Sequence, residues 1–283
     1  MTKTIRLKVP QWQGGNNPTY SLGADLLSFL VPKNLEHKEI EVPIPKYYEP
    51  LLQENGVTAQ SIVAKNVDQT ARIIQEENPD KIITLGGDCL VSQAPFDYLH
   101  GKYGEQLGII WLDAHPDIST PDIFCNEHAM VLGNLLKDGD PVLAEKVQHP
   151  FAAKDVLYVG LQTPTLDEKV VLERLGLEYQ VQDQVRLSPK EIKAWLRKHQ
   201  FTKVVVHFDL DVLDPNVFRM LYFSEPGVVE YSAEAGKMSL LEVKETMQAI
   251  AEQSEIVGLT IAELLPWDVE NLKNLLYDFE IFR

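Results

Sequence analysis

The sequence predicts an α/β fold, in which a mostly parallel sheet carries helices on both of its faces. Short apolar runs that fit strands alternate with helical stretches along the whole chain, an order that is typical of parallel sheets. The runs are nearly continuous in apolar residues, which indicates buried strands. About eight strands fit, over residues 3–9, 39–44, 81–85, 107–113, 155–161, 177–181, 203–210 and 256–263.

Helices are predicted between most of these strands. Residues 57–77 carry apolar side chains three to four positions apart, which form one stripe on a helix. The sequence Ser-Pro-Lys-Glu at 188–191 combines an N-cap, a proline in the first turn and a glutamate at the third position, so a helix is expected over 189–199. Ser-Leu-Leu-Glu at 239–242 predicts a similar start, for a helix that ends at about Gln253.

We expect a single domain that comprises residues 1–283. The chain has no internal repeat, low-complexity tract or linker-like stretch, and its length is sufficient to bury one large core. Residues 214–238 have no clear period. A loop of this length in a compact domain is usually functional, so we expect it to form a wall or lid of the site.

Charge and composition exclude several classes of protein. The formal net charge of −16 argues against nucleic acid and anionic membranes as partners, because a basic surface is missing. No stretch reaches ~18 continuous apolar residues, and residues 1–10 lack the apolar core of a signal peptide. Cys89 and Cys125 are too few for a secreted disulfide scaffold. We therefore expect a cytoplasmic protein.

Three polar side chains follow the apolar run that begins at Leu107. Asp113, His115 and Asp117 are spaced two residues apart, and alternate residues of an extended segment project to the same side. All three are potential metal ligands. Taken singly, each is explained as well by a turn, a helix cap or a hydrogen-bonded surface histidine.

A second apolar run, over 204–208, ends in the same way. Asp209 and Asp211 follow it, and Asp214 before a proline also fits a plain turn. Ligands of parallel sheets bind beyond the carboxyl ends of the strands, where both acidic clusters are expected. Carboxylates gathered there cannot all stay ionised unless cations neutralise them. Oxygen ligands with one imidazole favour manganese or a similar hard divalent ion.

These motifs resemble those of the arginase, agmatinase and formimidoylglutamase superfamily, the manganese ureohydrolases. The matching motifs are Gly86-Gly-Asp-Cys89, Asp113-Ala-His-Pro-Asp117, Asn126-Glu-His-Ala129, Phe208-Asp-Leu-Asp-Val-Leu-Asp-Pro215 and Glu263-Leu-Leu-Pro266. They follow the family's order. The resemblance implies a three-layer α/β/α domain with a central, mostly parallel eight-stranded sheet. It also implies a homo-oligomer, either a trimer or a hexamer.

The resemblance further implies two Mn²⁺ ions that share a bridging hydroxide. Two cations lower the pKa of shared water and give a hydroxide at neutral pH. That hydroxide would attack the carbon of a small guanidino or amidino substrate. The implied ligands are Asp113 and Asp209 as bridges, His115 and Asp211 at one ion, and Cys89 and Asp117 at the other.

The resemblance implies catalytic roles for His128 and Glu263. Asp117 is expected to be both a catalytic residue and a metal ligand. His128 matches a proton-shuttling histidine, which can protonate the departing amine because its pKa lies near neutrality. The alternative is an exposed loop histidine. Glu263 closes an apolar strand, where an unpaired carboxylate would be costly. Either a cationic substrate or a protein Arg or Lys would satisfy it.

Cys89 departs from the family, which has a histidine ligand at this position. A thiolate is a softer ligand than an imidazole and suits zinc or iron better than manganese. The ion beside Cys89 and Asp117 is therefore expected to be weaker, different or absent. A single ion, or another divalent metal such as Zn²⁺, stays open.

The expected substrate contacts also depart from those of arginases. Ser119 stands where arginases have a carboxylate-contacting asparagine, and Asn126 is what remains of their polar tract before the shuttle histidine His128. Residues 162–165 lack the acidic residue used for an α-amino group. Glu225, in the long loop, could offer a carboxylate to a positively charged tail. Free arginine is therefore not the expected substrate.

The sequence thus predicts a metal-dependent hydrolase of a guanidino or amidino C–N bond, without nucleic-acid or membrane partners. Two alternatives stay open. One is a non-catalytic relative that keeps the fold, and the other is a single-metal hydrolase of N-acyl amines similar to the deacetylases. The metal content of the protein separates the three hypotheses.

Overall fold

The computed structural model describes residues 2–45, 50–183, 186–277 and 279–282. Its main sheet is parallel and has seven strands in the order β2-β1-β5-β9-β8-β6-β7. The strands are β1 (Thr4–Val9), β2 (Lys38–Glu41), β5 (Lys81–Gly86), β6 (Leu107–Leu112), β7 (Val156–Val159), β8 (Lys203–Asp209) and β9 (Glu255–Ala262). A separate antiparallel pair is formed by β3 (Gln53–Glu54) and β4 (Val57–Thr58).

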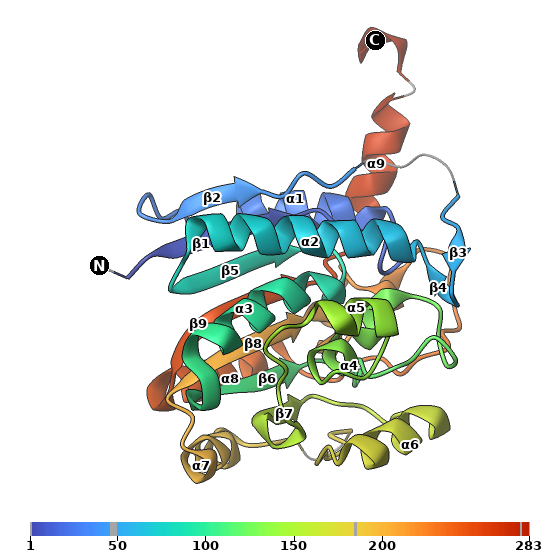
Figure 1. The fold of residues 1–283 in the computed structure, drawn as a ribbon. Helices are drawn as coiled ribbons and strands as arrows, with labels where there is room; N and C mark the ends of the chain where they lie inside the picture. The colour runs from blue at the N-terminus through green and yellow to red at the C-terminus, as the bar shows by residue number, and fades with distance from the viewer. Residues whose placement is uncertain (1, 46–49, 184–185, 278, 283) are drawn as a thin grey trace.

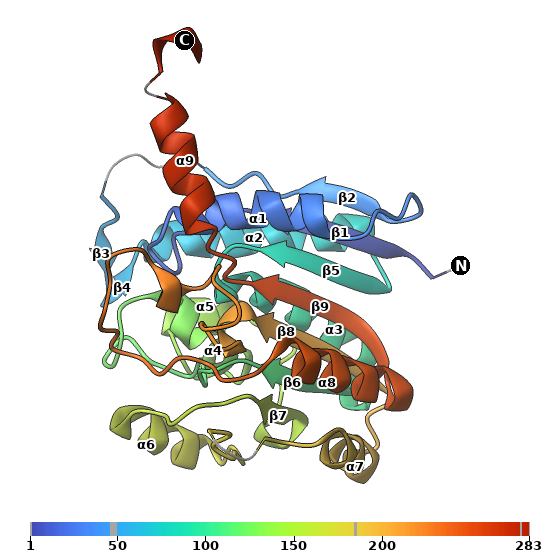
Figure 2. The same ribbon diagram turned by 180° about the vertical axis from the view of Figure 1, so that it is seen from behind.

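Helices cover both faces of the main sheet. Figure 1 shows α2, α3 and α5 in front of one face, and Figure 2 shows α1 and α8 in front of the other. The helices are α1 (Thr19–Leu30), α2 (Gln60–Glu77), α3 (Gln93–Tyr103), α4 (Val131–Leu135), α5 (Pro141–Lys146), α6 (Leu166–Leu175), α7 (Pro189–His199), α8 (Leu240–Gln253) and α9 (Trp267–Tyr277). The predicted three-layer α/β/α arrangement is confirmed. Within the described ranges, no helix has the length and apolarity needed to cross a bilayer.

Two buried clusters of apolar side chains form the core, one on each side of the sheet. Strand alternation assigns Ile109 and Trp111 of β6 to the first cluster, and Ile110 and Leu112 to the second. The first cluster includes side chains of α2 to α6, and the second includes side chains of α1, α7 and α8. The continuous apolar runs in the sequence therefore reflect strands that are covered on both faces.

Helices α7 and α8 begin where the sequence predicts. The hydroxyl of Ser188 accepts the N–H of Glu191 at 3.4 Å, and the Glu191 carboxylate accepts the N–H of Ser188 at 2.8 Å. Ser239 and Glu242 form the same reciprocal pair at the start of α8. Helix α2 begins a few residues later than predicted, at Gln60, because the preceding residues form β4.

The strand predicted over 177–181 is not formed, so the described sheet has seven strands where eight were expected. The reason lies in Gln182, which is buried beside β7. Its N–H donates to the Leu161 carbonyl at 2.7 Å. Its side-chain amide donates to the Tyr158 carbonyl at 3.1 Å and accepts the N–H of Gly160 at 2.9 Å. The Gln182 side chain thus occupies backbone hydrogen-bonding groups of Tyr158 and Gly160, with which an eighth strand would otherwise pair.

Gly87 lies where the N-terminal loop crosses the end of β5. A Cβ at this position would lie 1.6 Å from the carbonyl oxygen of Gln11, a backbone atom. We expect Gly87→Ala to lower the free energy of unfolding by about 1–3 kcal/mol, because one of the two segments must move. Urea unfolding measures this change.

Gly176→Asn is the matched control for this substitution. Gly176 follows α6 in the left-handed region with a φ of 68°, which asparagine tolerates, and nothing lies within 4 Å of its Cβ position. The control is expected to unfold close to the wild-type midpoint. An equally small change for Gly87→Ala would show that the loop does not cross β5 so closely.

Candidate active site

The candidate site lies at the carboxyl ends of four neighbouring strands, β5, β9, β8 and β6. Parallel pairing brings these ends to the same edge of the sheet, where ligands bind in folds of this class. Cys89 follows β5, Glu263 follows β9, Asp209 ends β8 and Asp113 follows β6. Four segments that are far apart in the sequence therefore each contribute an ionisable side chain to one place.

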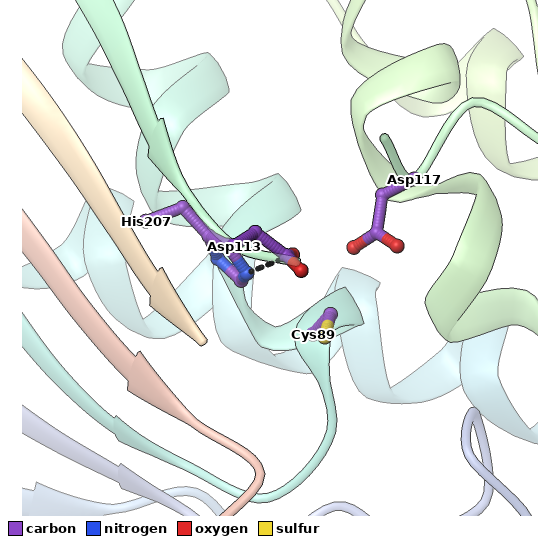
Figure 3. A group of neighbouring side chains, drawn as sticks. All are labelled: Cys89, Asp113, Asp117 and His207. Carbon is purple, nitrogen blue, oxygen red and sulfur yellow. Dashed lines mark ion pairs between the residues drawn. The ribbon is translucent and has the colours of Figure 1, made fainter. Parts of the chain in front are cut away.

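The predicted ligands come together at this edge. Among the described residues, four groups of side chains have potential ligand atoms that all lie within 4.8 Å of one another. The groups share members and form one continuous cluster. They are Cys89, Asp113, Asp117 and His207 (Figure 3); Cys89, His128 and Glu263; Asp113, His115 and Asp211; and Asp209, Asp211 and Glu263.

His115 lies between two carboxylates and the long loop. Its Nδ1 is 2.9 Å from Asp211 Oδ2 and 3.7 Å from Asp113 Oδ1. Its Nε2 is 3.1 Å from the carbonyl oxygen of Glu234, and its ring centroid is 6.0 Å from that of Phe223. Both of these residues belong to the loop over 214–238. The loop therefore forms a wall of the site, as predicted.

Cys89 contacts two carboxylates. Its thiol donates to Asp209 Oδ2 at 2.8 Å and lies 3.3 Å from Glu263 Oε1. Burial and these two neighbouring charges raise the pKa of Cys89 well above its usual value of 9.0. The thiol is therefore protonated at neutral pH until a cation displaces the proton, as metals do when they bind a thiol.

Glu263 is held by neighbouring side chains of the protein. Its Oε2 accepts the hydroxyl of Tyr20 at 2.6 Å, and its Oε1 lies 2.8 Å from Nδ1 of His128. Within the described ranges, no Arg or Lys bonds to this carboxylate. Burial lowers the pKa of His128, but the Glu263 charge and hydrogen bond outweigh burial and raise it to about 9. His128 is therefore a half-buried, protonated partner of Glu263, not an exposed loop histidine.

Three buried aspartates make the site strongly unfavourable for negative charge. Burial, and then the charge of neighbouring carboxylates, raises the pKa of Asp113, Asp117 and Asp209 well above 3.8. Burial also tends to raise the pKa of Asp211, but the neighbouring His115 lowers it overall. Oδ2 of Asp113 and Oδ2 of Asp117 have no hydrogen-bond partner. Buried carboxylate oxygens without partners fit a site for divalent cations.

Asp88 and Asp214 lie near this cluster but form hydrogen bonds that stabilise nearby loops. Asp214 accepts the N–H of Asn216 at 2.8 Å, which is the plain turn that the sequence also allowed. Asp88 accepts the side chain of Gln11 at 2.9 Å and the N–H of Gly15 at 3.2 Å, and burial raises its pKa to about 6. Asp88 thus fixes the N-terminal loop over the site.

The three residues expected to bind substrate do not join the ligand cluster. Ser119 is buried and donates its N–H to the carbonyl of Ala129 at 2.9 Å. Asn126 accepts a long contact of 3.7 Å from Cys125 Sγ. Glu225 lines a separate pocket of about 660 Å³ between the long loop and the start of α9. Phe223, which contacts His115, also lines this pocket and so lies between it and the ligand cluster.

His207 is a residue of the site that the sequence did not predict. It is fully buried, and its ring stacks on Trp111 with centroids 3.8 Å apart. Its Nδ1 lies 2.7 Å from Ser92 Oγ and its Nε2 lies 3.5 Å from Asp113 Oδ2. Burial lowers its pKa to about 3. A histidine inside an otherwise apolar strand is the signal that could have found it.

Tyr20 was also not predicted as part of the site. It is separated from Glu263 by 243 residues in the sequence, and no local pattern links the two.

The sequence is similar to those of proteins of one known family. Residues 34–273 match the model of the arginase family. The arginase of Entamoeba histolytica is 25% identical over 229 residues, which cover 75% of this chain and 77% of that protein. Human arginase-1 is 27% identical over 222 residues, which cover 70% of this chain and 69% of that protein.

Solved structures of arginases have the same fold. The arginase of Bacillus caldovelox superposes with a TM-score of 0.79 at 21% identity, over 94% of this chain and 92% of that one. Identity this low establishes the fold alone. The family match, in contrast, extends over most of the chain and includes every motif at the carboxyl ends of β5, β6, β8 and β9. The chain therefore belongs to the arginase family.

Proposed function

We propose that this protein hydrolyses a C–N bond in a small guanidino or amidino compound, with divalent ions held by the clustered side chains. The observation that carries the proposal is the meeting of buried carboxylates from β6 and β8, with oxygens of Asp113 and Asp117 left without partners. A buried cluster of this charge is stable at neutral pH when cations neutralise it.

Two ions are proposed, and Asp113 and Asp209 would help to hold both. When bound, they lower the pKa of water and supply a hydroxide at neutral pH. The ion position beside His115 and Asp211 has mostly oxygen ligands, which suit manganese. The side that includes the thiol is open to a single-ion site or to a metal such as Zn²⁺. The proposed ligands are His115 and Asp211 on the first side, and Cys89 and Asp117 on the second.

Two residues of the chain are proposed to bind substrate and move protons. The Glu263 carboxylate, oriented by the Tyr20 hydroxyl, would accept N–H groups of a cationic guanidinium or amidinium. His128 keeps its Nδ1 proton on Glu263, which leaves the Nε2 proton for the nitrogen of the departing amine. Asp117 would act in catalysis through the ion that it holds.

The substrate is proposed to differ from free arginine. Solved formimidoylglutamase from Bacillus subtilis shares this fold, with a TM-score of 0.67 at 15% identity over 94% of this chain and 80% of that one. The fold therefore supports other substrates. We propose that Ser119 and Asn126 contact the substrate, and that the pocket containing Glu225 receives its tail. Cytoplasmic location and assembly as a trimer or hexamer stay predictions.

The test is turnover of a panel of guanidino and formimino compounds by protein loaded with Mn²⁺. We expect release of urea, ammonia or formamide from at least one compound other than arginine, and loss of this release in Glu263→Gln. Acetylated amines belong in the panel, because their turnover with one zinc per chain would favour the deacetylase-like alternative. If the protein holds two ions and turns over no compound, the proposal is wrong. A purified chain that binds no ion would instead favour the non-catalytic relative.

A further inference from the structure

We infer that His207 is a direct metal ligand, and that Cys89, Asp113, Asp117 and His207 together hold one ion. Figure 3 shows these four side chains around a common space. The inference rests on the proposed metal site but not on the proposed reaction. It makes the two ion positions chemically different, because this one has a thiolate and an imidazole as well as carboxylates.

The sheet register places His207 directly beneath the acidic cluster. His207 of β8 pairs with Trp111 of β6. Side chains two residues apart on a strand share a face, so His207 lies on the face of Asp209, and Trp111 lies on the face of Asp113. The imidazole therefore reaches the cluster from the layer below the two aspartates.

Two contacts fix the direction of the His207 ring. Trp111 stacks on one of its faces, and Ser92 Oγ lies 2.7 Å from Nδ1. Nε2 is consequently the atom that faces the cluster, and it has no hydrogen-bond partner. Metal-bound histidines commonly donate their second ring N–H to a neighbouring acceptor, which is the role that this geometry gives to Ser92.

The spacing of the facing atoms suits a shared cation. Nε2 of His207 lies 3.5 Å from Oδ2 of Asp113, which also has no hydrogen-bond partner. This distance exceeds that of an ordinary hydrogen bond, about 2.7–3.2 Å. Two atoms that bind one tetrahedral ion at about 2.0–2.1 Å lie roughly 3.4 Å apart. Both atoms are therefore already near the separation that coordination requires.

The donor set determines which ion is expected. Thiolate and imidazole together favour zinc over manganese, whereas the His115 and Asp211 side keeps mostly oxygen donors. We therefore expect one zinc-type ion and one harder ion per chain. Binding at the Cys89 side requires that the thiol lose its contact with Asp209 Oδ2 and release its proton.

The test uses the full chain, stripped of metal and titrated with Zn²⁺ against a chelating dye, and with Co²⁺ as a spectroscopic probe. Wild-type protein is expected to show a thiolate-to-cobalt absorption band and the strong visible bands of a four-coordinate ion. His207→Gln is expected to keep the thiolate band, lose intensity in the visible bands and bind Zn²⁺ at least about 100-fold more weakly. Cys89→Ser is expected to lose the thiolate band.

Trp111→Phe is the matched control, because it changes the packing of the His207 ring without removing a donor atom. It should keep the wild-type cobalt spectrum. The inference is overturned if His207→Gln has the wild-type spectrum and Zn²⁺ affinity, or if Trp111→Phe weakens binding as much as His207→Gln does. These readouts do not involve turnover, so an inactive protein with a His207-dependent zinc site would refute only the proposed reaction.

A measurement on the wild-type protein covers the case in which His207→Gln does not fold. In a zinc-soaked crystal, anomalous scattering should place the ion about 2.0–2.1 Å from Nε2 of His207. An ion bound by Cys89 but more than about 3 Å from Nε2 would overturn the inference, and would leave His207 as a buried neighbour of Asp113.

Discussion

Asp209→Asn is expected to have opposite effects on stability in the ion-free and the ion-loaded protein. Without ions, Asp209 is a buried carboxylate beside Glu263 and Asp211, and burial raises its pKa well above 3.8. The neutral amide removes the free-energy cost of protonating this carboxyl when the chain folds, so the ion-free variant should unfold at a higher temperature than ion-free wild type. With ions present, the same change removes a proposed metal ligand.

In the ion-loaded protein, Asp209→Asn should cause a large loss of stability and of metal affinity. An ion at one hundred times its dissociation constant stabilises a folded protein by about 2.7 kcal/mol, and this gain disappears when the ion no longer binds. We expect metal affinity and hydrolysis to fall at least about 100-fold, since changes in residues that only support ligands already cost 10–100-fold. Thermal unfolding with and without Mn²⁺, together with metal analysis, measures both effects.

Asp214→Asn is the matched control on the same segment. Asp214 accepts the N–H of Asn216 in a turn and belongs to none of the ligand groups found among the described residues. Its metal content should equal that of wild type. An Asp209→Asn protein that keeps two tightly bound ions would refute the ligand role of Asp209.

The ion-free protein is expected to lose stability as pH rises, whereas the ion-loaded protein should not. The pKa of Asp113 and of Asp117 is raised well above 3.8, because of burial and then of neighbouring carboxylates. Burial opposes charge on His115 and His128, but nearby carboxylates raise the pKa of both above 6.5. The folded protein therefore keeps protons that the unfolded chain has already lost, and stability falls with increasing pH.

The pH window follows from these shifts. The aspartates begin to destabilise the ion-free fold above about pH 4, and the histidines add to this above 6.5. His128, with its pKa raised from 6.5 to about 9, contributes roughly 3 kcal/mol over that interval. Urea unfolding of chelator-treated protein from pH 5 to 9 should show a falling midpoint. Bound ions replace the protons of the aspartates and of His115, so the loaded protein should be more stable at neutral pH than the ion-free protein.

A rising midpoint in the chelator-treated protein would contradict the arrangement of the cluster. It would mean that the carboxylates are ionised and separately solvated, not gathered in a buried site. Glu191→Gln serves as a control, because its carboxylate lies in an exposed capping box far from this charge. It should shift the midpoint by a similar amount at pH 6 and at pH 9.

Much of the fold could be predicted because its signals are local. The capping pairs at Ser188 and Ser239 set the starts of α7 and α8, and their partners lie three residues away. The strand ends at Asp113 and Asp209 could be located because apolar runs stop there. Parallel strands then bring those ends to one edge without further information.

The features that the sequence alone could not decide depend on neighbours across the sheet. The missing eighth strand results from the side chain of Gln182, which bonds to the backbone of β7. From the sequence, His207 is one more residue of a buried strand. Its pairing with Trp111 in the sheet brings it close to Asp113. A short sequence pattern reports spacing along one segment, whereas the direction of a donor atom depends on side chains contributed by other segments.

The sequence by itself therefore determined the α/β class and the strands that end in acidic residues, and it predicted the kind of ions that such residues favour. The tertiary structure decided which side chains share one space: Tyr20 with Glu263, and His207 with Cys89. The physical reason is that strand alternation and helix capping act over a few residues, while burial and electrostatic coupling act between any atoms that the fold brings within a few ångströms.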